Sequence, residues 1–151
     1  MSKDLQMQLH NQLNVSQGKY TYFLLAIAAS AIVFSTQITK DGVFSISLIP
    51  LGLAVLSWGL SFYCGCQNIL YTNSNTIANI ELLRVEAGEH EDVLTHPQLM
   101  QAASEGIRKA FESNTDKLCS YNNWQFRFIL TGAVLFIIWH LIEMAMRTIG
   151  N

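Results

Sequence analysis

The sequence has few charged residues and few cysteines. Charged residues make up 13% of its 151 residues, against about 25% in an average soluble domain. This shortage of charge argues against a soluble domain, although the length would suit one. The three cysteines are an odd number, which forms no closed disulfide framework. We interpret the C-x-C pair of Cys64 and Cys66 as close packing at a helix end, with lipidation as the alternative.

Catalytic motifs are also missing. The sequence has no nucleophile with a base and an orienting acid, and no phosphate-binding loop. His90, Glu91, Asp92 and His96 do not match the H-E-x-x-H pattern of a metal-binding helix, so we interpret them as a solvated acidic turn. We predict that the protein is not an enzyme and that it holds no cofactor and no metal. The sequence also lacks the internal repeat that a transporter built from one chain usually has.

Apolar residues gather in three blocks, each long enough to cross a bilayer as one helix. A spanning helix needs about 20 mostly apolar residues. The predicted transmembrane helices are residues 20–38, 43–71 and 126–148. These blocks are continuous rather than alternating, a pattern that favours helices over membrane strands. We therefore predict an all-α integral membrane protein that crosses the bilayer three times.

The basic residues predict the orientation of the chain. Lysine and arginine favour the cytoplasmic side of a membrane. With residues 1–19 in the cytoplasm, seven of the nine bases lie inside, and only Lys40 and Arg147 lie outside. The cysteines then face the reducing cytoplasm, where disulfides are rare. We predict a multi-pass protein of the bacterial inner membrane, with its N-terminus in the cytoplasm and its C-terminus outside.

Residues 72–125 separate the second and third blocks and have a helical pattern. Apolar residues recur every three or four positions, Gly88 suits a helix end, and Thr95 and Pro97 suit the start of the next helix. We predict that this segment is an antiparallel helical hairpin, which extends the second and third spans into the cytoplasm. Its apolar stripes are narrow, and this favours partner helices in a homo-oligomer.

The predicted hairpin is acidic, with eight acidic and four basic residues and a net charge of −4. It is therefore not a general nucleic-acid arm or a basic lipid-binding patch. Its bases could still line a pocket for an anionic ligand: Arg108 and Lys109 are adjacent, Arg84 would lie on the facing helix, and Lys117 follows on the second helix. The alternative is that all four are ordinary solvated charges.

Two helix faces inside the predicted spans stand out. On the second span Ser57, Ser61 and Gly65 are spaced by four residues. Small residues at this spacing allow helices to pack closely, or they place small polar groups beside a water path. The sequence leaves both interpretations open.

The second face lies on the third span. His140, Glu143 and Arg147 are three and four residues apart and share one side of the helix. Counted from Phe128 at the inner surface, His140 lies about 18 Å deep in an apolar core of about 30 Å. Either Glu143 reaches outward to pair with Arg147 while His140 bonds a neighbouring group, or this face lines a wet path.

Three helices in one copy are too few for a pore, so we expect function from a homo-oligomer or a larger complex. The first hypothesis is an oligomeric ion channel or pore-forming effector, gated by a ligand on the cytoplasmic hairpin. The alternative is a non-conducting membrane subunit or scaffold that recruits a cognate cytoplasmic protein through the hairpin. The face of Ser57, Ser61, Gly65 and His140 must be wet in a channel and dry in a scaffold.

The layout resembles the small multi-pass, channel-forming membrane effectors of bacterial antiphage defence, of the Hailong type. The resemblance covers the whole chain and rests on its architecture. It is carried by the spans containing FLLAIAASAIVF, LGLAVLSWGLSF and ILTGAVLFIIWHLI, and by the helical insert containing IRKAF. The resemblance implies a tetramer-like ring, with a nucleotide or oligonucleotide ligand held by the cytoplasmic bases.

Overall fold

The chain is almost entirely helical. The computed structural model describes residues 3–40, 45–88 and 97–149, and for residues 3–14 and 149 the backbone only. No strand occurs in these ranges, which confirms the predicted all-α class. The residues interpreted as an acidic turn, His90 to His96, lie outside the described part of the chain, as does the predicted helix start at Thr95.

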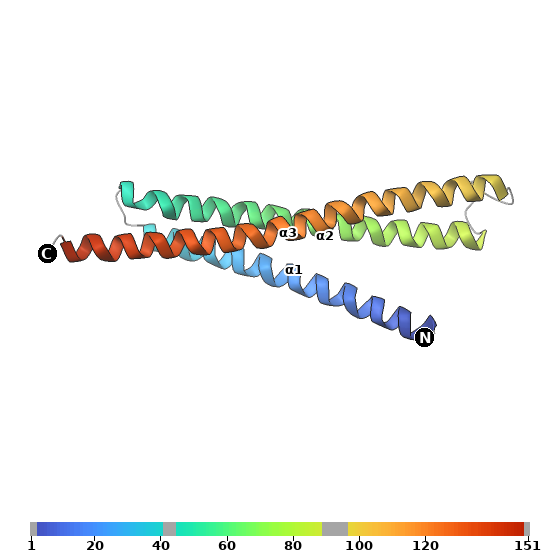
Figure 1. Ribbon diagram of the computed structural model, residues 1–151, viewed down its shortest axis with the longest axis horizontal. Coiled ribbons are helices and arrows are strands. Elements are labelled where there is room, and N and C mark those ends of the chain that lie inside the picture. Colours follow the sequence, from blue (N-terminus) through green and yellow to red (C-terminus); the bar gives the residue numbers. More distant parts are fainter. Residues whose placement is uncertain (1–2, 41–44, 89–96, 150–151) are drawn as a thin grey trace. The chain divides into compact units, whose positions relative to one another are not determined.

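Three long helices make up the structure (Figure 1). They are α1 (Lys3–Thr39), α2 (Ile49–Ala87) and α3 (Pro97–Ile149), and a short 3-10 turn (η1, Ile46–Leu48) precedes α2. Each long helix contains a stretch that is long and apolar enough to cross a membrane, as the sequence predicted. At 39 and 53 residues, α2 and α3 are much longer than the roughly 20 residues of a span. Each therefore continues well beyond its apolar part.

Local sequence explains where the helices begin and end. α2 ends at Ala87, and Gly88 adopts a φ of 72°, which glycine reaches without steric cost. The N–H of Gly88 donates to the carbonyl of Val85 at 3.1 Å and so satisfies one terminal acceptor. Pro50 and Pro97 lie in the first turns of α2 and α3, where a missing N–H costs nothing. The predicted helix end at Gly88 is confirmed.

The residues cluster into two compact units. The apolar unit comprises Met1–Cys66 and Asn122–Asn151, and the polar unit comprises Gln67–Tyr121. The apolar unit holds α1, the first part of α2 and the last part of α3, while the polar unit holds the remaining parts of α2 and α3.

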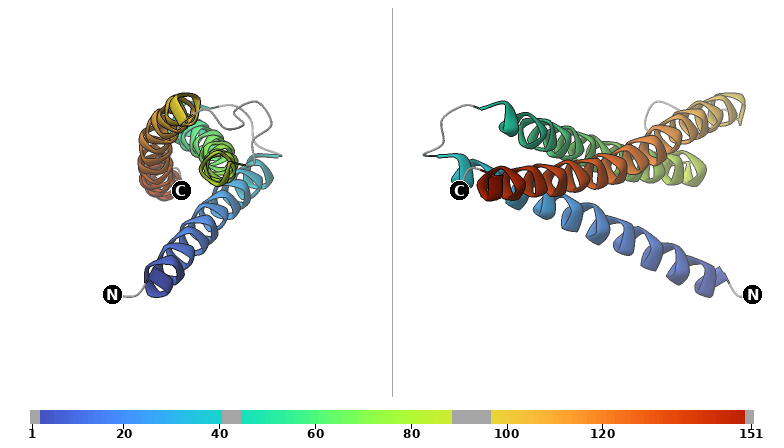
Figure 2. Two further views of the ribbon diagram at one scale, coloured as in Figure 1. Left: turned by 90° about the vertical axis from the view of Figure 1, so that its right-hand side faces the viewer. Right: turned by 60° about the vertical axis from the view of Figure 1, so that its left-hand side comes forward.

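The core of the apolar unit is small. Ala28, Ala54 and Trp58 are buried at its centre, and Phe136 packs against them. The Phe136 ring lies 5.9 Å from the Trp58 ring and 6.3 Å from the Phe34 ring, centroid to centroid, and so joins α1, α2 and α3. The right-hand view of Figure 2 shows the last part of α1 crossing α3, to which the contact of Phe34 with Phe136 joins it. Three aromatic side chains therefore hold this end of the unit together.

The outer surface of the apolar unit is also apolar. Phe23 on α1, Leu56 on α2 and Val134 on α3 are each more than half exposed. Soluble monomers rarely expose contiguous apolar patches larger than a few hundred Å². Such a surface is suited to lipid, in agreement with three helices that could cross a membrane.

In the polar unit α2 and α3 run in opposite directions. Asn68 Nδ2 donates to the carbonyl of Leu118 at 3.4 Å, and Asn75 Nδ2 donates to Thr115 Oγ1 at 3.1 Å. Towards the end of α2, Arg108 pairs with Glu86, so residue numbers rise on one helix as they fall on the other. Amide and hydroxyl groups thus contribute to the contact between the two segments. Whether the segment connecting them completes a cytoplasmic hairpin stays a prediction.

Candidate functional site

The small residues of α2 are enclosed within one chain. Ser61 is fully buried, and its Oγ donates to the backbone carbonyl of Gln125 on α3 at 2.9 Å. A Cβ added to Gly65 would lie 2.5 Å from Gln125 Nε2 and 2.7 Å from Leu25 Cδ2 on α1. Ser57 is half-buried. Ser61, Gly65 and Gln125 form a seam, called here the closed seam, that leaves no room for a column of water.

The sequence analysis missed Gln125, the residue at the centre of this seam. Its side chain is fully buried, Nε2 donates weakly to the carbonyl of Thr21 at 3.5 Å, and Oε1 has no partner within the described residues. Burying an amide oxygen without a donor costs about 1–3 kcal/mol. The helical periodicity of α3 could have predicted that Gln125 is buried, because Gln125 continues the buried stripe of this helix. That stripe also includes Ile129, Gly132 and Trp139.

A second close approach joins α2 and α3. A Cβ added to Gly132 would overlap the indole ring of Trp58. Trp58 is 5% exposed, and it fills the space that the missing side chain leaves. Helical periodicity places Gly132 near the side of His140, whereas the structure turns it towards the core.

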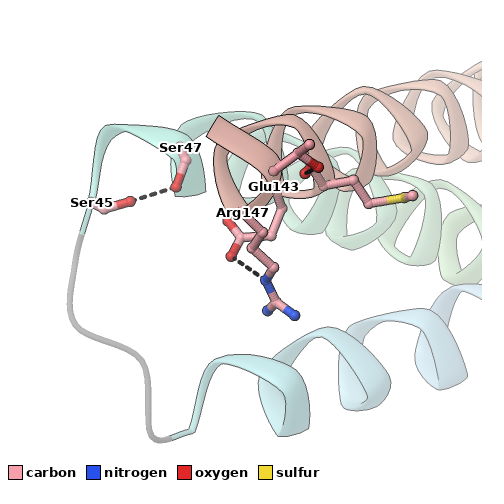
Figure 3. Close-up of polar contacts among 6 residues, drawn as sticks. Ser45, Ser47, Glu143 and Arg147 are labelled. Carbon is pink, nitrogen blue, oxygen red and sulfur yellow. Dashed lines mark hydrogen bonds and ion pairs between the residues drawn. The ribbon is translucent and has the colours of Figure 1, made fainter. Parts of the chain in front are cut away.

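The three ionisable residues of α3 lie together at the far end of the apolar unit. Arg147 Nε donates to Glu143 Oε1 at 3.2 Å. This confirms the first part of one interpretation of this face, in which Glu143 pairs with Arg147. Figure 3 shows this pair on the side of α3 that faces the end of α1, near the hydrogen-bonded hydroxyls of Ser45 and Ser47. His140 is exposed, and within the described residues it has no hydrogen bond. The other half of that interpretation, a bond from His140 to a neighbouring group, is therefore not observed.

These residues line a groove between α1 and α3. The groove has a volume of about 350 Å³, and its apolar walls come from both helices. We call it the open groove. It is lined by Phe34 and Ile38 on α1, and by Phe136, Trp139, His140, Glu143, Met144 and Arg147 on α3. The indole N–H of Trp139 is buried and finds no acceptor within the described part of the chain.

The predicted membrane site is therefore divided in two. Ser61 and Gly65 belong to the closed seam, where α2 meets α1 and α3. His140 and Glu143 belong to the open groove, which no residue of α2 lines. From the sequence we expected Ser61, Gly65 and His140 to share one face. The periodicity of a helix cannot show which side of α3 meets α2.

Two bases of the polar unit, Arg84 and Arg108, each pair with an acidic residue. Arg84 pairs with Glu81 at 3.1 Å, one turn earlier on α2, and Arg108 pairs with Glu86 across the two helices at 3.0 Å. All four of these side chains are at least one-third exposed, so each pair stabilises the fold by at most about 1 kcal/mol. An anionic ligand could replace the acid in such a weak pair.

The other two bases differ from the arginines. Lys117 Nζ lies 5.5 Å from the centroid of the Tyr71 ring, and this ring stacks on Tyr121 at 5.6 Å. Lys109 is exposed on α3. Whether Arg84, Arg108, Lys109 and Lys117 form one ligand site therefore stays a prediction.

The cysteines are all free. Cys64 is buried, Cys66 is half-buried and Cys119 is exposed. Burial makes Cys64 a packing residue, whereas Cys66 remains partly accessible. Within the described ranges no three histidine, cysteine, aspartate or glutamate side chains gather as metal ligands.

Comparison with known proteins identifies no relative of this chain. No known protein family matches the chain, and neither the curated proteins nor the solved structures contain a significant match. The resemblance to the antiphage channel effectors therefore stays a prediction from the layout of the chain.

Proposed function

We propose that the protein is an oligomeric ion channel of a bacterial inner membrane, with its water path bordered by the open groove of α3. One observation carries this proposal: His140 is exposed from a helix that is apolar enough to cross a membrane, and it lies beside the Glu143–Arg147 pair. Lipid is a poor solvent for such groups, and ionisable residues in membrane helices mark functional paths by default. Several copies, for instance four, would have to surround the path.

The closed seam makes α2 a supporting helix in this proposal. Ser61 and Gly65 already have neighbours on α1 and α3 and face no open space. The path therefore runs along α3 rather than along the small residues of α2. This modifies the hypothesis in which Ser57, Ser61 and His140 share one wet face.

The polar unit is the proposed sensor and lies in the cytoplasm. An anionic ligand, such as a nucleotide or oligonucleotide, would compete with Glu81 and Glu86 for Arg84 and Arg108. Breaking the Arg108–Glu86 pair would loosen a contact between α2 and α3. Because both helices continue into the apolar unit, the ligand would shift the balance between closed and open states.

Ion flux tests the proposal. The purified protein is reconstituted in liposomes, and flux is recorded for the wild type, for His140→Ala and for the neighbouring variant Leu141→Ala. We expect flux in the wild type, a change of several-fold in His140→Ala and no change in Leu141→Ala. Flux should also respond to added nucleotides or short oligonucleotides, and Arg108→Gln should weaken that response. Liposomes that stay tight with correctly inserted protein would contradict the channel.

The alternative function is a non-conducting scaffold. Leu83 on α2 and Leu99 on α3 are each more than half exposed in the polar unit, as a docking surface for a cytoplasmic partner would be. Tight liposomes together with a specific partner recovered through the polar unit would favour this function.

A further inference from the structure

The open groove has polar groups that find no hydrogen-bond partner among the described residues. His140 is exposed without a hydrogen bond, and the buried N–H of Trp139 has no acceptor within the described residues. Glu143 offers a second carboxylate oxygen beyond the one that binds Arg147. A donor, an acceptor and an apolar wall thus lie within two turns of one helix.

Lipid does not satisfy these groups. Counted from Phe128 at the inner surface, Trp139 lies about 17 Å and His140 about 18 Å into an apolar core of about 30 Å. At this depth a lipid presents hydrocarbon, because its phosphate and ester oxygens lie near the surfaces. A protein neighbour or a line of water must therefore supply the partner of the exposed His140.

We propose that α3 of a second copy of this chain packs along one edge of the open groove and leaves the rest of the groove to the water path, and that His140 of each copy donates a hydrogen bond to Glu143 of its neighbour. This inference rests on the proposed channel and names the contact that assembles it. Copies inserted in the same orientation hold equal residues at equal depth. His140 and Glu143 differ by three residues, or about 4.5 Å in depth, which their side chains can bridge.

The chemistry of the groove makes the contact self-complementary. Each copy contributes both a donor, His140, and an acceptor, Glu143, so identical surfaces can satisfy one another around a closed ring. The apolar walls at Phe34, Ile38 and Met144 supply van der Waals packing, which drives helix association in membranes. Arg147 stays paired with Glu143 within its own copy.

Thiol cross-linking in liposomes tests the contact. Met144 and Leu141 provide a matched pair, because they are 54% and 59% exposed but only Met144 lines the groove. Each is replaced by cysteine in a variant whose three native cysteines are changed to alanine. A short, flexible thiol–thiol cross-linker is then added, and covalent dimers are counted on a denaturing gel. Circular dichroism and ion flux of both variants check that they fold and assemble.

We expect at least five-fold more dimer from Met144→Cys than from Leu141→Cys. Adding His140→Ala to Met144→Cys should reduce the yield, because it removes the donor from the contact. Equal yields at the two positions, or none at either, would overturn the proposed contact. Mass spectrometry of the intact protein gives a second readout of what occupies the groove. A phospholipid that stays bound to monomers, and is lost in Ile38→Trp, would identify lipid as the occupant instead.

Flux distinguishes this inference from the channel itself. Flux without cross-linking at Met144→Cys leaves the channel standing and removes the groove as its interface. Cross-linking at Met144→Cys in liposomes that stay tight supports the contact and contradicts the channel.

Discussion

The closed seam and the open groove place polar residues inside the same apolar unit with opposite results. At the seam Ser61 and Gln125 are fully buried, and α1, α2 and α3 meet around them. At the groove His140 and Arg147 are exposed, and the space between α1 and α3 is not filled. Polar residues in apolar helices can therefore serve either the packing of one chain or contacts beyond it.

The size of the neighbouring side chains explains this difference. At the seam the absent side chain of Gly65 lets α1 and α3 approach α2 closely. At the groove the rings of Phe34 and Phe136 already meet, with centroids 6.3 Å apart, and the space beyond them towards the helix ends stays open. Substitutions at the seam should thus change stability, whereas substitutions at the groove should change assembly and flux.

Gly132→Ala should have the largest effect on stability. The added methyl overlaps the buried ring of Trp58, which has little room to move, and overpacking of this kind costs about 1–3 kcal/mol. Denaturation by SDS in mixed micelles, followed by circular dichroism, measures the change. Gly59→Ala is the matched control on α2, because nothing lies within 4 Å of its added Cβ. A similar loss of stability in both variants would contradict the packing of Trp58 on Gly132.

Gly65→Ala should destabilise the unit by a smaller amount, about 1 kcal/mol. Its added methyl meets the end of the Gln125 side chain and the side chain of Leu25, both of which can rotate away. Gln125→Asn withdraws the amide by one methylene, so the double variant should lose at least about 0.5 kcal/mol less than the two single losses combined. Additive losses in the same SDS denaturation would show that Gly65 and Gln125 are not in contact.

The length of the helices and the positions of their ends could be predicted from the sequence. Gly88 ends α2 and Pro97 begins α3 because backbone conformation is set by these residues locally. The pairing of Glu143 with Arg147 was predictable for the same reason, since i and i+4 residues of one helix are neighbours.

The division between seam and groove could not be predicted, because it depends on how the helices are rotated against one another. Periodicity places Gly132 and His140 near one side of α3, but only the packing of Trp58 turns Gly132 inward. Gln125 was missed because it lies just before the apolar block, where polar residues normally face water. The spacing of Arg84 and Arg108 likewise did not show that each has an acidic partner.

Ser61→Ala and His140→Ala should separate stability from function. Ser61→Ala removes one buried hydrogen bond, and such bonds in membrane helices contribute about 0.6 kcal/mol on average. His140→Ala removes no hydrogen bond within the described part of one chain, so the unfolding of the single chain should match that of the wild type while assembly and flux change. Unchanged flux in His140→Ala, with a clear change in Ser61→Ala, would reverse the roles of seam and groove.

Arg108→Gln should have the smallest effect on stability. Its partner Glu86 and its own side chain are both about half exposed, so the pair contributes about 0–1 kcal/mol and is screened by salt. The difference from the wild type should shrink further between low and high salt concentration in the same denaturation assay. A loss well above 1 kcal/mol that persists at high salt would show that the pair is a structural contact of the polar unit.

Water access along the apolar unit tests the central claim most directly. Single cysteines at positions 61, 140 and 143, in a variant without native cysteines, are exposed in liposomes to a charged thiol reagent that does not cross lipid. The account predicts labelling of His140→Cys and Glu143→Cys and none of Ser61→Cys. Labelling at position 61 with protection at 140 and 143 would contradict it, because the path would then follow α2 and the groove of α3 would be dry.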